Sequence, residues 1–196
     1  MASTLYATLP ELKAARKITA EDDDQALTQA LTAACRQIDR KTGRPPGAFA
    51  LDDNATARTF GVVGRTTVDG LLLVDDIGDI ADLVVESGTG SAWSPVTGYD
   101  TGPDNALATG QPITTLIAPP GGYWAGPRVR VTARWGWPAV PDEISRAALL
   151  LANRLYMRKD SPGGVVGSAE WGAVRLSRWD PDVEELVGPY VLPGFA

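Results

Sequence analysis

The chain contains no histidine among its 196 residues and one cysteine, Cys35. Without histidine there is no serine–histidine or cysteine–histidine catalytic pair, and the commonest general base is missing. Most catalytic zinc sites also use histidine. One cysteine cannot form a disulfide within the chain, and its place on a helical apolar stripe favours buried packing over a reactive thiol. We therefore expect no catalytic, cofactor or metal site of these kinds.

Long hydrophobic runs are also missing. No stretch approaches the roughly 18–20 apolar residues that a membrane span needs. The first residues, Met1–Thr4, lack the basic and apolar regions of a signal peptide. We therefore expect no membrane partner. With 44% hydrophobic residues, the chain has enough apolar side chains for one good core, or one core and a small second one.

Basic residues are scarce in the middle of the chain. Between residues 51 and 127, only Arg58 and Arg65 stand against ten acidic residues, whereas both flanks are nearly neutral. A surface that grips duplex DNA is basic, because it must neutralise phosphates. The middle is therefore expected to be an ordinary solvated acidic face, or a surface that lies near DNA without adhering to it.

Two long helices are predicted on either side of this acidic region. They cover Asp22–Thr42 and Pro141–Lys159, and glycine and proline follow each of them. Each has one apolar stripe at helical spacing, so the two are expected to pack against each other. Their predicted buried residues are Leu27, Leu31, Ile38, Ile144, Ala148, Leu151 and Leu155. Capping patterns predict two shorter helices, Leu9–Lys17 and Pro181–Tyr190.

Short segments rich in β-branched residues lie between the long helices and predict strands. They are Ala57–Val63, Leu71–Val74, Ala81–Glu86, Ile113–Ala118 and Arg128–Trp135, with a turn-rich excursion over residues 88–112. The predicted fold class is α+β: a helical bundle base formed by the N- and C-terminal helices, with an inserted β-rich subdomain. The expected regions are 1–49 (N-terminal helices), 50–136 (the acidic insert), 137–160 (the helix completing the bundle) and 161–196. The last comprises a flexible loop, an extended arm and a short helix.

Two local patterns resemble ligand sites without matching them. Residues 61–66 (GVVGRT) lack the spacing of a phosphate-binding loop, and a tight β-turn is the better interpretation. The acids Asp75, Asp76, Asp79 and Asp82 lack the order of a calcium loop and are interpreted as solvated turn carboxylates. Neither pattern predicts a cofactor or a metal.

Several segments on both flanks resemble a known family. Tyr6–Lys13 (YATLPELK), Ala33–Arg44 (AACRQIDRKTGR), Val131–Pro141 and Leu155–Gly164 look like the corresponding parts of head-to-tail connector (adaptor) proteins of long-tailed bacteriophages. In the middle of the chain the resemblance extends only to the general β character. No single motif is diagnostic, and the ordered set carries the resemblance.

The resemblance implies a virion structural protein and no enzyme. Such proteins form a ring, expected here to be dodecameric, beneath the portal protein at the capsid vertex, where they lengthen the DNA channel and dock the next neck or tail protein. The capsid is a further candidate partner, and DNA passes without sequence-specific binding. The expected location is the neck of the virion, with host cytoplasm during assembly. Alternatives are another neck or tail-completion protein, or a bacterial enzyme or binding domain.

Two sets of residues are candidates for function. One is an arm expected to order on a neighbouring molecule, with an edge strand on the chain's own core as the alternative; its residues are Trp171, Arg175, Arg178 and Trp179, with Arg158 and Lys159 before it. The other is a set of acids that would repel DNA from a channel wall, with the outer solvent or the capsid as the alternative. These acids are Asp52, Asp53, Asp69, Asp75, Asp76, Asp79 and Asp82.

Overall fold

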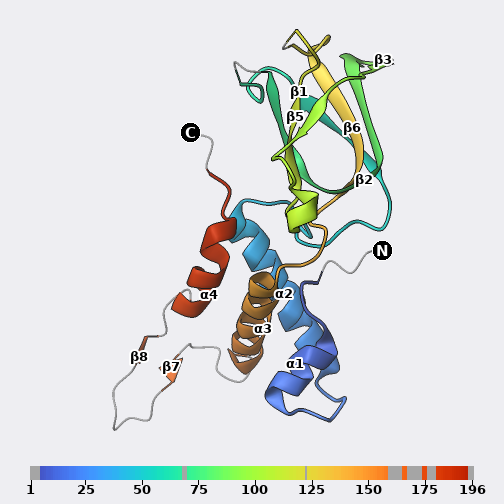
Figure 1. Cartoon of the computed structure of the whole chain (residues 1–196). Helices are drawn as coiled ribbons and strands as arrows, with labels where there is room; N and C mark the ends of the chain where they lie inside the picture. The colour runs from blue at the N-terminus through green and yellow to red at the C-terminus, as the bar shows by residue number, and fades with distance from the viewer. Residues whose placement is uncertain are drawn as a thin grey trace. The chain divides into compact units, whose positions relative to one another are not determined.

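The structure, a computed structural model, describes residues 5–67, 70–121, 123–158, 165–166, 174–175 and 180–193, the two short pairs by their backbone alone. The chain divides into two compact units (Figure 1). A helical unit is formed by Thr4–Gly47 and Val140–Ala196, and a β unit is formed by Ala48–Ala139. Helices and an antiparallel sheet are both present, so the predicted α+β class is confirmed.

The four predicted helices are confirmed, with small differences at their ends. They are α1 (Leu9–Arg16), α2 (Asp24–Thr42), α3 (Asp142–Met157) and α4 (Pro181–Val187), the last followed by a 3₁₀ turn, η3 (Gly188–Tyr190). The predicted capping box begins α1, because the Glu11 N–H donates to Thr8 Oγ1 (3.3 Å) and the Thr8 N–H to Glu11 Oε2 (2.6 Å). Gly43 ends α2 with a φ of 73°.

Helices α2 and α3 pack against each other, as their apolar stripes predict. Of the seven residues predicted to be buried, six are buried, and Cys35 is buried as well. Leu155 is only partly buried, so this prediction was wrong. The inward line of α3 runs through Ala148, Ala152 and Tyr156 at intervals of four residues, which leaves Leu155 beside it.

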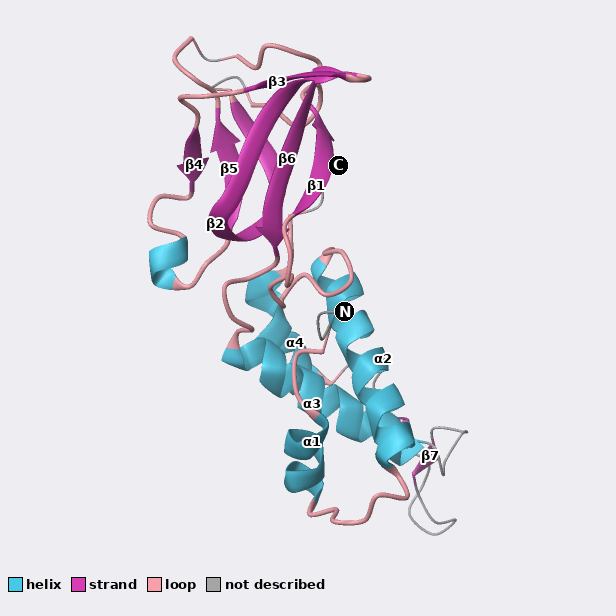
Figure 2. Cartoon of the chain, turned by 90° about the vertical axis from the view of Figure 1, so that its right-hand side faces the viewer, coloured by secondary structure: helices cyan, strands magenta, loops and turns pink. Residues whose placement is uncertain are grey.

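The β unit contains a six-stranded antiparallel sheet in the order β1-β6-β2-β5-β4, with β3 paired to β2 (Figure 2). The strands are β1 (Thr56–Gly61), β2 (Leu71–Thr89), β3 (Ala92–Pro95), β4 (Asp100–Gly102), β5 (Ile113–Ile117) and β6 (Arg128–Trp135). The predicted alternation of β6 is confirmed, because Val129, Val131 and Ala133 are fully buried in the core. The expected excursion over residues 88–112 was only partly right: it also holds β3, β4 and a 3₁₀ turn, η1 (Leu107–Thr109).

Strand β2 differs most from the prediction, because two expected strands are one continuous strand. Its first part pairs with β5 and its second part with β6, and Ile77 pairs with both. Next to Ile77, a Cβ atom on Gly78 would lie 2.7 Å from Leu51 Cδ1 and 2.8 Å from Gly136 O. Glycine therefore lets β2 change partner at this point while its backbone passes close to that of Gly136.

Candidate functional site

Charged side chains on the outside of the sheet are matched across strands. Arg130 of β6 donates to both carboxylate oxygens of Glu86 on β2, from Nε and Nη2, each at 2.7 Å. Its guanidinium carbon also lies 4.6 Å from the centre of the Trp93 ring on β3. The hydrogen bonds from Arg130 lower the pKa of Glu86 and raise the pKa of Arg130 itself. The three strands are thus joined by one bidentate ion pair and one ring contact.

A second pair lies at the other end of β6. Arg134 Nη1 is 2.8 Å from Asp79 Oδ2, and Arg134 Nε donates to the carbonyl oxygen of Asp52 at 3.0 Å. The Ala81 N–H donates to Asp79 Oδ1 at 2.9 Å. This backbone hydrogen bond and then the Arg134 guanidinium hold the pKa of Asp79 below its ordinary value. Asp79 is therefore a fixed, ionised carboxylate whose charge is balanced by Arg134.

A third arginine, Arg58 of β1, neutralises two more acids. Its Nη1 lies 2.8 Å from Asp75 Oδ2 and its Nη2 lies 3.9 Å from Asp52 Oδ2. The guanidinium also stacks over the Trp135 ring, 4.4 Å from the ring centre, and Trp135 is buried. Arg58 therefore joins β1 to the first part of β2 through side chains.

The expectation that the acids near residue 75 are solvated turn carboxylates was wrong. Asp75, Asp76, Asp79 and Asp82 all lie on β2, because that strand continues through the expected turn. Asp76 is buried and accepts a hydrogen bond from Trp137 Nε1 at 3.1 Å. Of the four, only Asp82 is exposed and without an ion pair in the described part of the chain.

The seven acids proposed for a channel wall therefore differ in their surroundings. Asp52, Asp75 and Asp79 are paired with arginines, Asp76 is buried, and Asp69 lies outside the described residues. Asp53 and Asp82 are exposed and make no ion pair with any described residue. The described side chains include no group of three or more potential metal ligands. No helix in the described ranges is long and apolar enough to cross a membrane.

The proposed arm lies mainly outside the described residues. Lys159, Trp171, Arg178 and Trp179 lie outside the described residues. Arg175 belongs to β8 (Val174–Arg175) in the expected arm. This strand pairs in antiparallel fashion with β7 (Val165–Val166), which lies in the expected flexible loop. Arg158 follows the last turn of α3, and its side chain is partly buried.

Besides its charged side chains, the β unit exposes large apolar side chains that the sequence analysis did not predict. Val63 is 92% exposed, Tyr123 73%, Ile80 51% and Val84 48%. The tight turn expected at residues 61–66 is present, and Val63 lies within it. Ile80 could not have been found from alternation, because it lies in a bulge of β2 that only the register of the strands reveals.

No family model matches the sequence, and no curated protein matches it. Among solved structures, a chain in a structure described as the neck of an empty GTA particle, computed with C6 symmetry, aligns with a TM-score of 0.57 and 17% identity. A chain in the virion of a native gene transfer agent (GTA) particle aligns with a TM-score of 0.54 and 19% identity. Each alignment covers 97% of this chain and 92% of the other. At this identity the comparison shows a shared fold over nearly the whole chain, so at the level of fold the predicted resemblance is confirmed.

Proposed function

We propose that this chain is a structural component of the neck of a phage-like particle, with no catalytic role. The similarity of its fold to a chain in a GTA neck, over 97% of its length, carries this proposal. The surface of the sheet agrees with it, because Arg58, Arg130 and Arg134 are used in cross-strand ion pairs. These arrangements stiffen a sheet and offer no nucleophile or general base.

The finer proposal is a head-to-tail adaptor that forms a ring beneath the portal protein. The neighbouring neck structure was computed with C6 symmetry. A twelve-membered ring contains a sixfold axis, so the expected dodecamer is compatible with that symmetry. Its proposed partners are the portal protein, the next neck or tail protein and the capsid, and its proposed locations are the virion and the host cytoplasm during assembly.

A ring in this position would surround the DNA channel. Of the acids proposed for the channel wall, Asp53 and Asp82 carry exposed charges without a described partner, so the channel hypothesis now depends mainly on these two. A negative wall lets DNA slide because it repels phosphate. Tight binding of the purified protein to duplex DNA at moderate salt, measured by fluorescence anisotropy, would count against this role.

The arm remains a proposal as well. Trp171, Arg175, Arg178 and Trp179 would bind a neighbouring molecule, with Arg158 and Lys159 at the base of the arm. Deletion of Val165–Trp179 tests it. We expect the shortened protein to fold but to join the neck with reduced occupancy. Normal occupancy would show that the arm is not needed for assembly.

The experiment that tests the main proposal is electron cryo-microscopy of particles that carry this chain with a small C-terminal tag. We expect density for the chain as a ring between the head and the tail, in contact with the portal. A ring lower in the tail would favour a tail-completion protein instead. Absence of the chain from purified particles would overturn the proposal and favour an enzyme or binding domain.

A further inference from the structure

One end of the β unit presents apolar and basic side chains on a rigid frame. Val63 lies in a turn closed by hydrogen bonds from the Arg65 and Thr66 N–H groups to the Val62 carbonyl oxygen (3.3 and 3.1 Å). The Val62 N–H in turn donates to Pro127 O at 3.0 Å, which ties this turn to the loop before β6. The almost fully exposed Val63 is therefore held in a fixed position.

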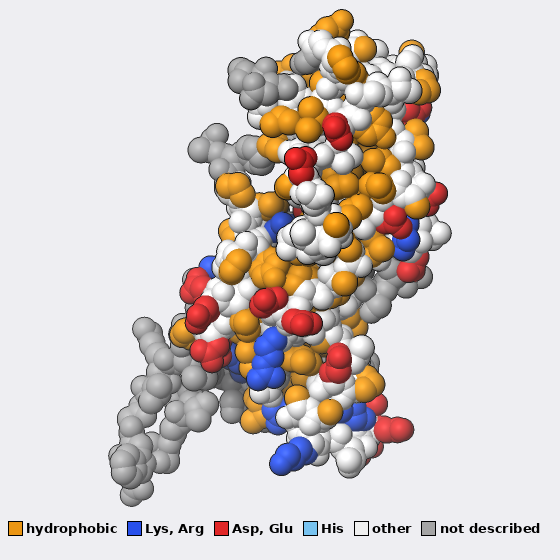
Figure 3. Space-filling view, in the orientation of Figure 1, with side chains coloured by type: hydrophobic (Ala, Val, Ile, Leu, Met, Phe, Trp, Pro, Cys, Tyr) orange, Lys and Arg blue, Asp and Glu red, His pale blue; other side chains and the backbone are white. Residues whose placement is uncertain are grey.

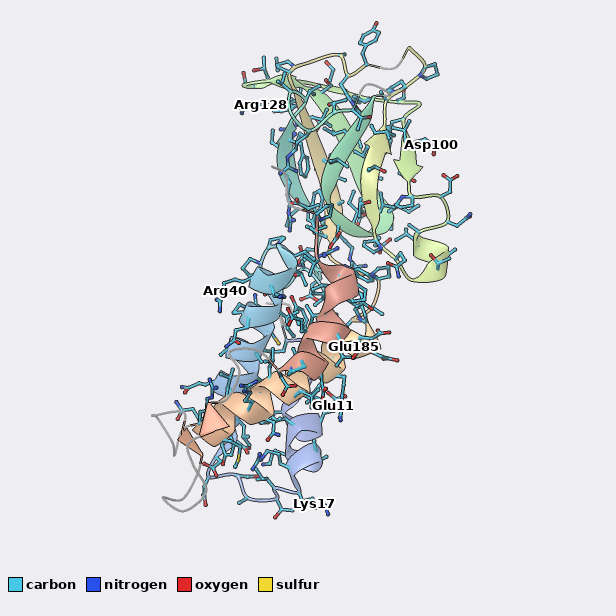
Figure 4. All side chains as sticks on the ribbon, turned by 90° about the vertical axis from the view of Figure 1, so that its left-hand side faces the viewer. Glu11, Lys17, Arg40, Asp100, Arg128 and Glu185 are labelled. Carbon is cyan, nitrogen blue, oxygen red and sulfur yellow. The ribbon has the colours of Figure 1, made fainter. Side chains whose placement is uncertain are left out.

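The loop before β6 adds an aromatic ring and a cation to the same end. Trp124 is buried and donates from Nε1 to Gly70 O at 3.2 Å, which anchors the loop beside Tyr123. Arg128 begins β6, is exposed and makes no ion pair with any described residue (Figure 4). We call Val63, Arg65, Tyr123 and Arg128 the loop end.

The loop end contrasts with the acidic unit that carries it. The described residues of its two segments, 61–67 and 119–128, include Arg65 and Arg128 and no acid. Arg65 lies over the Phe60 ring and its Nη1 is 3.9 Å from Asp75 Oδ1, so Arg128 carries the unpaired charge among the described residues of this end. On the face drawn in Figure 3, the outermost coloured atoms of this end of the β unit are hydrophobic or uncharged, and acidic atoms lie farther down. Exposed aromatic and arginine side chains on a fixed frame are typical anchors of protein interfaces.

A surface with the opposite charge lies elsewhere on the same sheet. Between the pairs Asp79–Arg134 and Val84–Thr132, β2 advances by five residues while β6 advances by two. The extra residues form a bulge, in which Ile80 and Asp82 are exposed, and Val84 at its end is exposed as well. Arg134, the basic residue beside the bulge, is already paired with Asp79. We call Ile80, Asp82 and Val84 the bulge patch.

We propose that the loop end of one copy of this chain docks on the bulge patch of a second copy. The apolar side chains of the two surfaces would cover one another, and Arg128 would meet the carboxylate of Asp82. Asp82 would then lie in this contact, which leaves Asp53 as the exposed acid for a channel wall. By register, the two surfaces are four to six residues of β6 apart, about 13–20 Å along the strand. A contact between two different surfaces is head-to-tail, so each copy can bind two neighbours and a closed ring can form.

A second copy fits the loop end better than DNA does. Phosphate binding requires several cations and gives no role to the exposed side chains of Val63 and Tyr123. An apolar surface with one carboxylate matches both the apolar side chains and the cation of the loop end. The inference deepens the proposed ring and rests on it. Its failure would leave the location of the chain in the neck unaffected, because that location is measured on particles.

Cross-linking of the full chain tests the contact. A Tyr123→Cys chain is mixed with an Ile80→Cys chain, which keeps Asp82, under mild oxidation, and the mixed disulfide is followed by mass spectrometry. The control replaces Ile80→Cys by Asp104→Cys, because Asp104 is an exposed residue of the same unit outside both surfaces. Cys35 is buried and contributes little background.

We expect the Ile80→Cys mixture to form its disulfide about tenfold faster than the control, because docking raises the effective concentration of the two thiols. Equal rates would overturn the proposal. Faster pairing of Tyr123→Cys with itself would also overturn it, because a symmetric contact would then join two loop ends.

A charge exchange tests the chemistry of the contact. With thiols at Tyr123→Cys and Ile80→Cys, Arg128→Glu on the first chain should slow the reaction, and Asp82→Lys on the second should restore it. No slowing, or no restoration, would contradict the assigned charge pairing. Binding of a labelled DNA duplex tests the competing interpretation of the loop end. If Arg65→Glu with Arg128→Glu abolishes duplex binding and the cross-linking rate equals that of the control, the loop end binds DNA and the proposal is wrong.

Discussion

Different kinds of contact stabilise the interior of the helical unit and the interior of the β unit. In the helical unit, α2 and α3 meet through apolar side chains that recur every three or four residues, such as Leu31 and Ile144. In the β unit, parts of the backbone approach so closely that only glycine fits, as at Gly78 and Gly136. The helical unit therefore depends on apolar side chains that fill its core. At Gly78 and Gly136 the β unit depends on residues without a Cβ atom.

One carboxylate in each unit adds a second contrast. The helical unit buries Asp39, which accepts hydrogen bonds from the Tyr6 hydroxyl and the Gly47 N–H and lies 3.1 Å from Arg36 Nη1. Burial outweighs these partners and raises the pKa of Asp39. In the β unit, Glu86 lies on the outside of the sheet and its pKa is lowered. The contributions of these two carboxylates to stability are thus expected to change with acid in opposite directions.

The largest expected effect is on the side-chain core of the helical unit. Leu31→Asp places a carboxylate without a partner in a fully buried position. The variant loses apolar packing and must bury a charge, so we expect the free energy of unfolding to fall by about 5 kcal/mol or more. Helical circular dichroism against urea measures it. Gln29→Asp, on the exposed face of the same helix, is the control; similar losses in the two variants would show that burial is not the cause.

The next effect tests the backbone contacts of the β unit. At Gly136, which has a φ of 112°, a Cβ atom would lie 2.1 Å from Ala50 O. Gly136→Ala should therefore cost about 4 kcal/mol, from overlap with backbone and from the strained φ together. Gly64 has a φ of 82° and open space around it, so Gly64→Ala should cost only about 1 kcal/mol. Tryptophan fluorescence during urea unfolding measures both, and equal costs would show that the close approach contributes nothing.

This contrast explains what the sequence could and could not predict. A helical stripe appears directly in the order of residues, so α2 and α3 were predicted, and six of the seven residues predicted to be buried in them are buried. The course of β2 depends on Gly78, and the spacing of Asp75, Asp76 and Asp79 is compatible with a turn as well as a strand. The bulge patch depends on the register between β2 and β6, which no local pattern specifies. The candidate surfaces follow from this long-range pairing.

A smaller effect concerns the pH dependence of the helical unit. The folded-state pKa of Asp39 is raised, so the protonated carboxyl contributes to the stability of the folded state. This contribution to stability is fully present below the unfolded-state pKa of about 4 and is lost as the pH rises through the folded-state pKa. Asp39→Asn removes this titration. The stability of the wild type relative to Asp39→Asn should therefore be greater at pH 4 than at pH 7. Urea unfolding at both pH values measures it, with the exposed Asp22→Asn as control; a constant difference would mean that Asp39 does not titrate as expected.

The smallest effect is expected at the ion pair on the outside of the sheet. Arg130 lowers the folded-state pKa of Glu86, so the ionised carboxylate contributes to the stability of the folded state. This contribution to stability is present above the unfolded-state pKa of about 4.3 and is lost as the pH falls through the folded-state pKa. The stability of the wild type relative to Glu86→Gln should therefore be greater at pH 7 than at pH 3, opposite in sign to the Asp39 series. The change should be small, because solvent screens an exposed pair. Tryptophan fluorescence during urea unfolding at the two pH values measures it, and Asp104→Asn, which is exposed and unpaired among the described residues, is the control. If Glu86→Gln and Asp39→Asn changed with pH in the same direction, the expected contrast between these two carboxylates would be wrong.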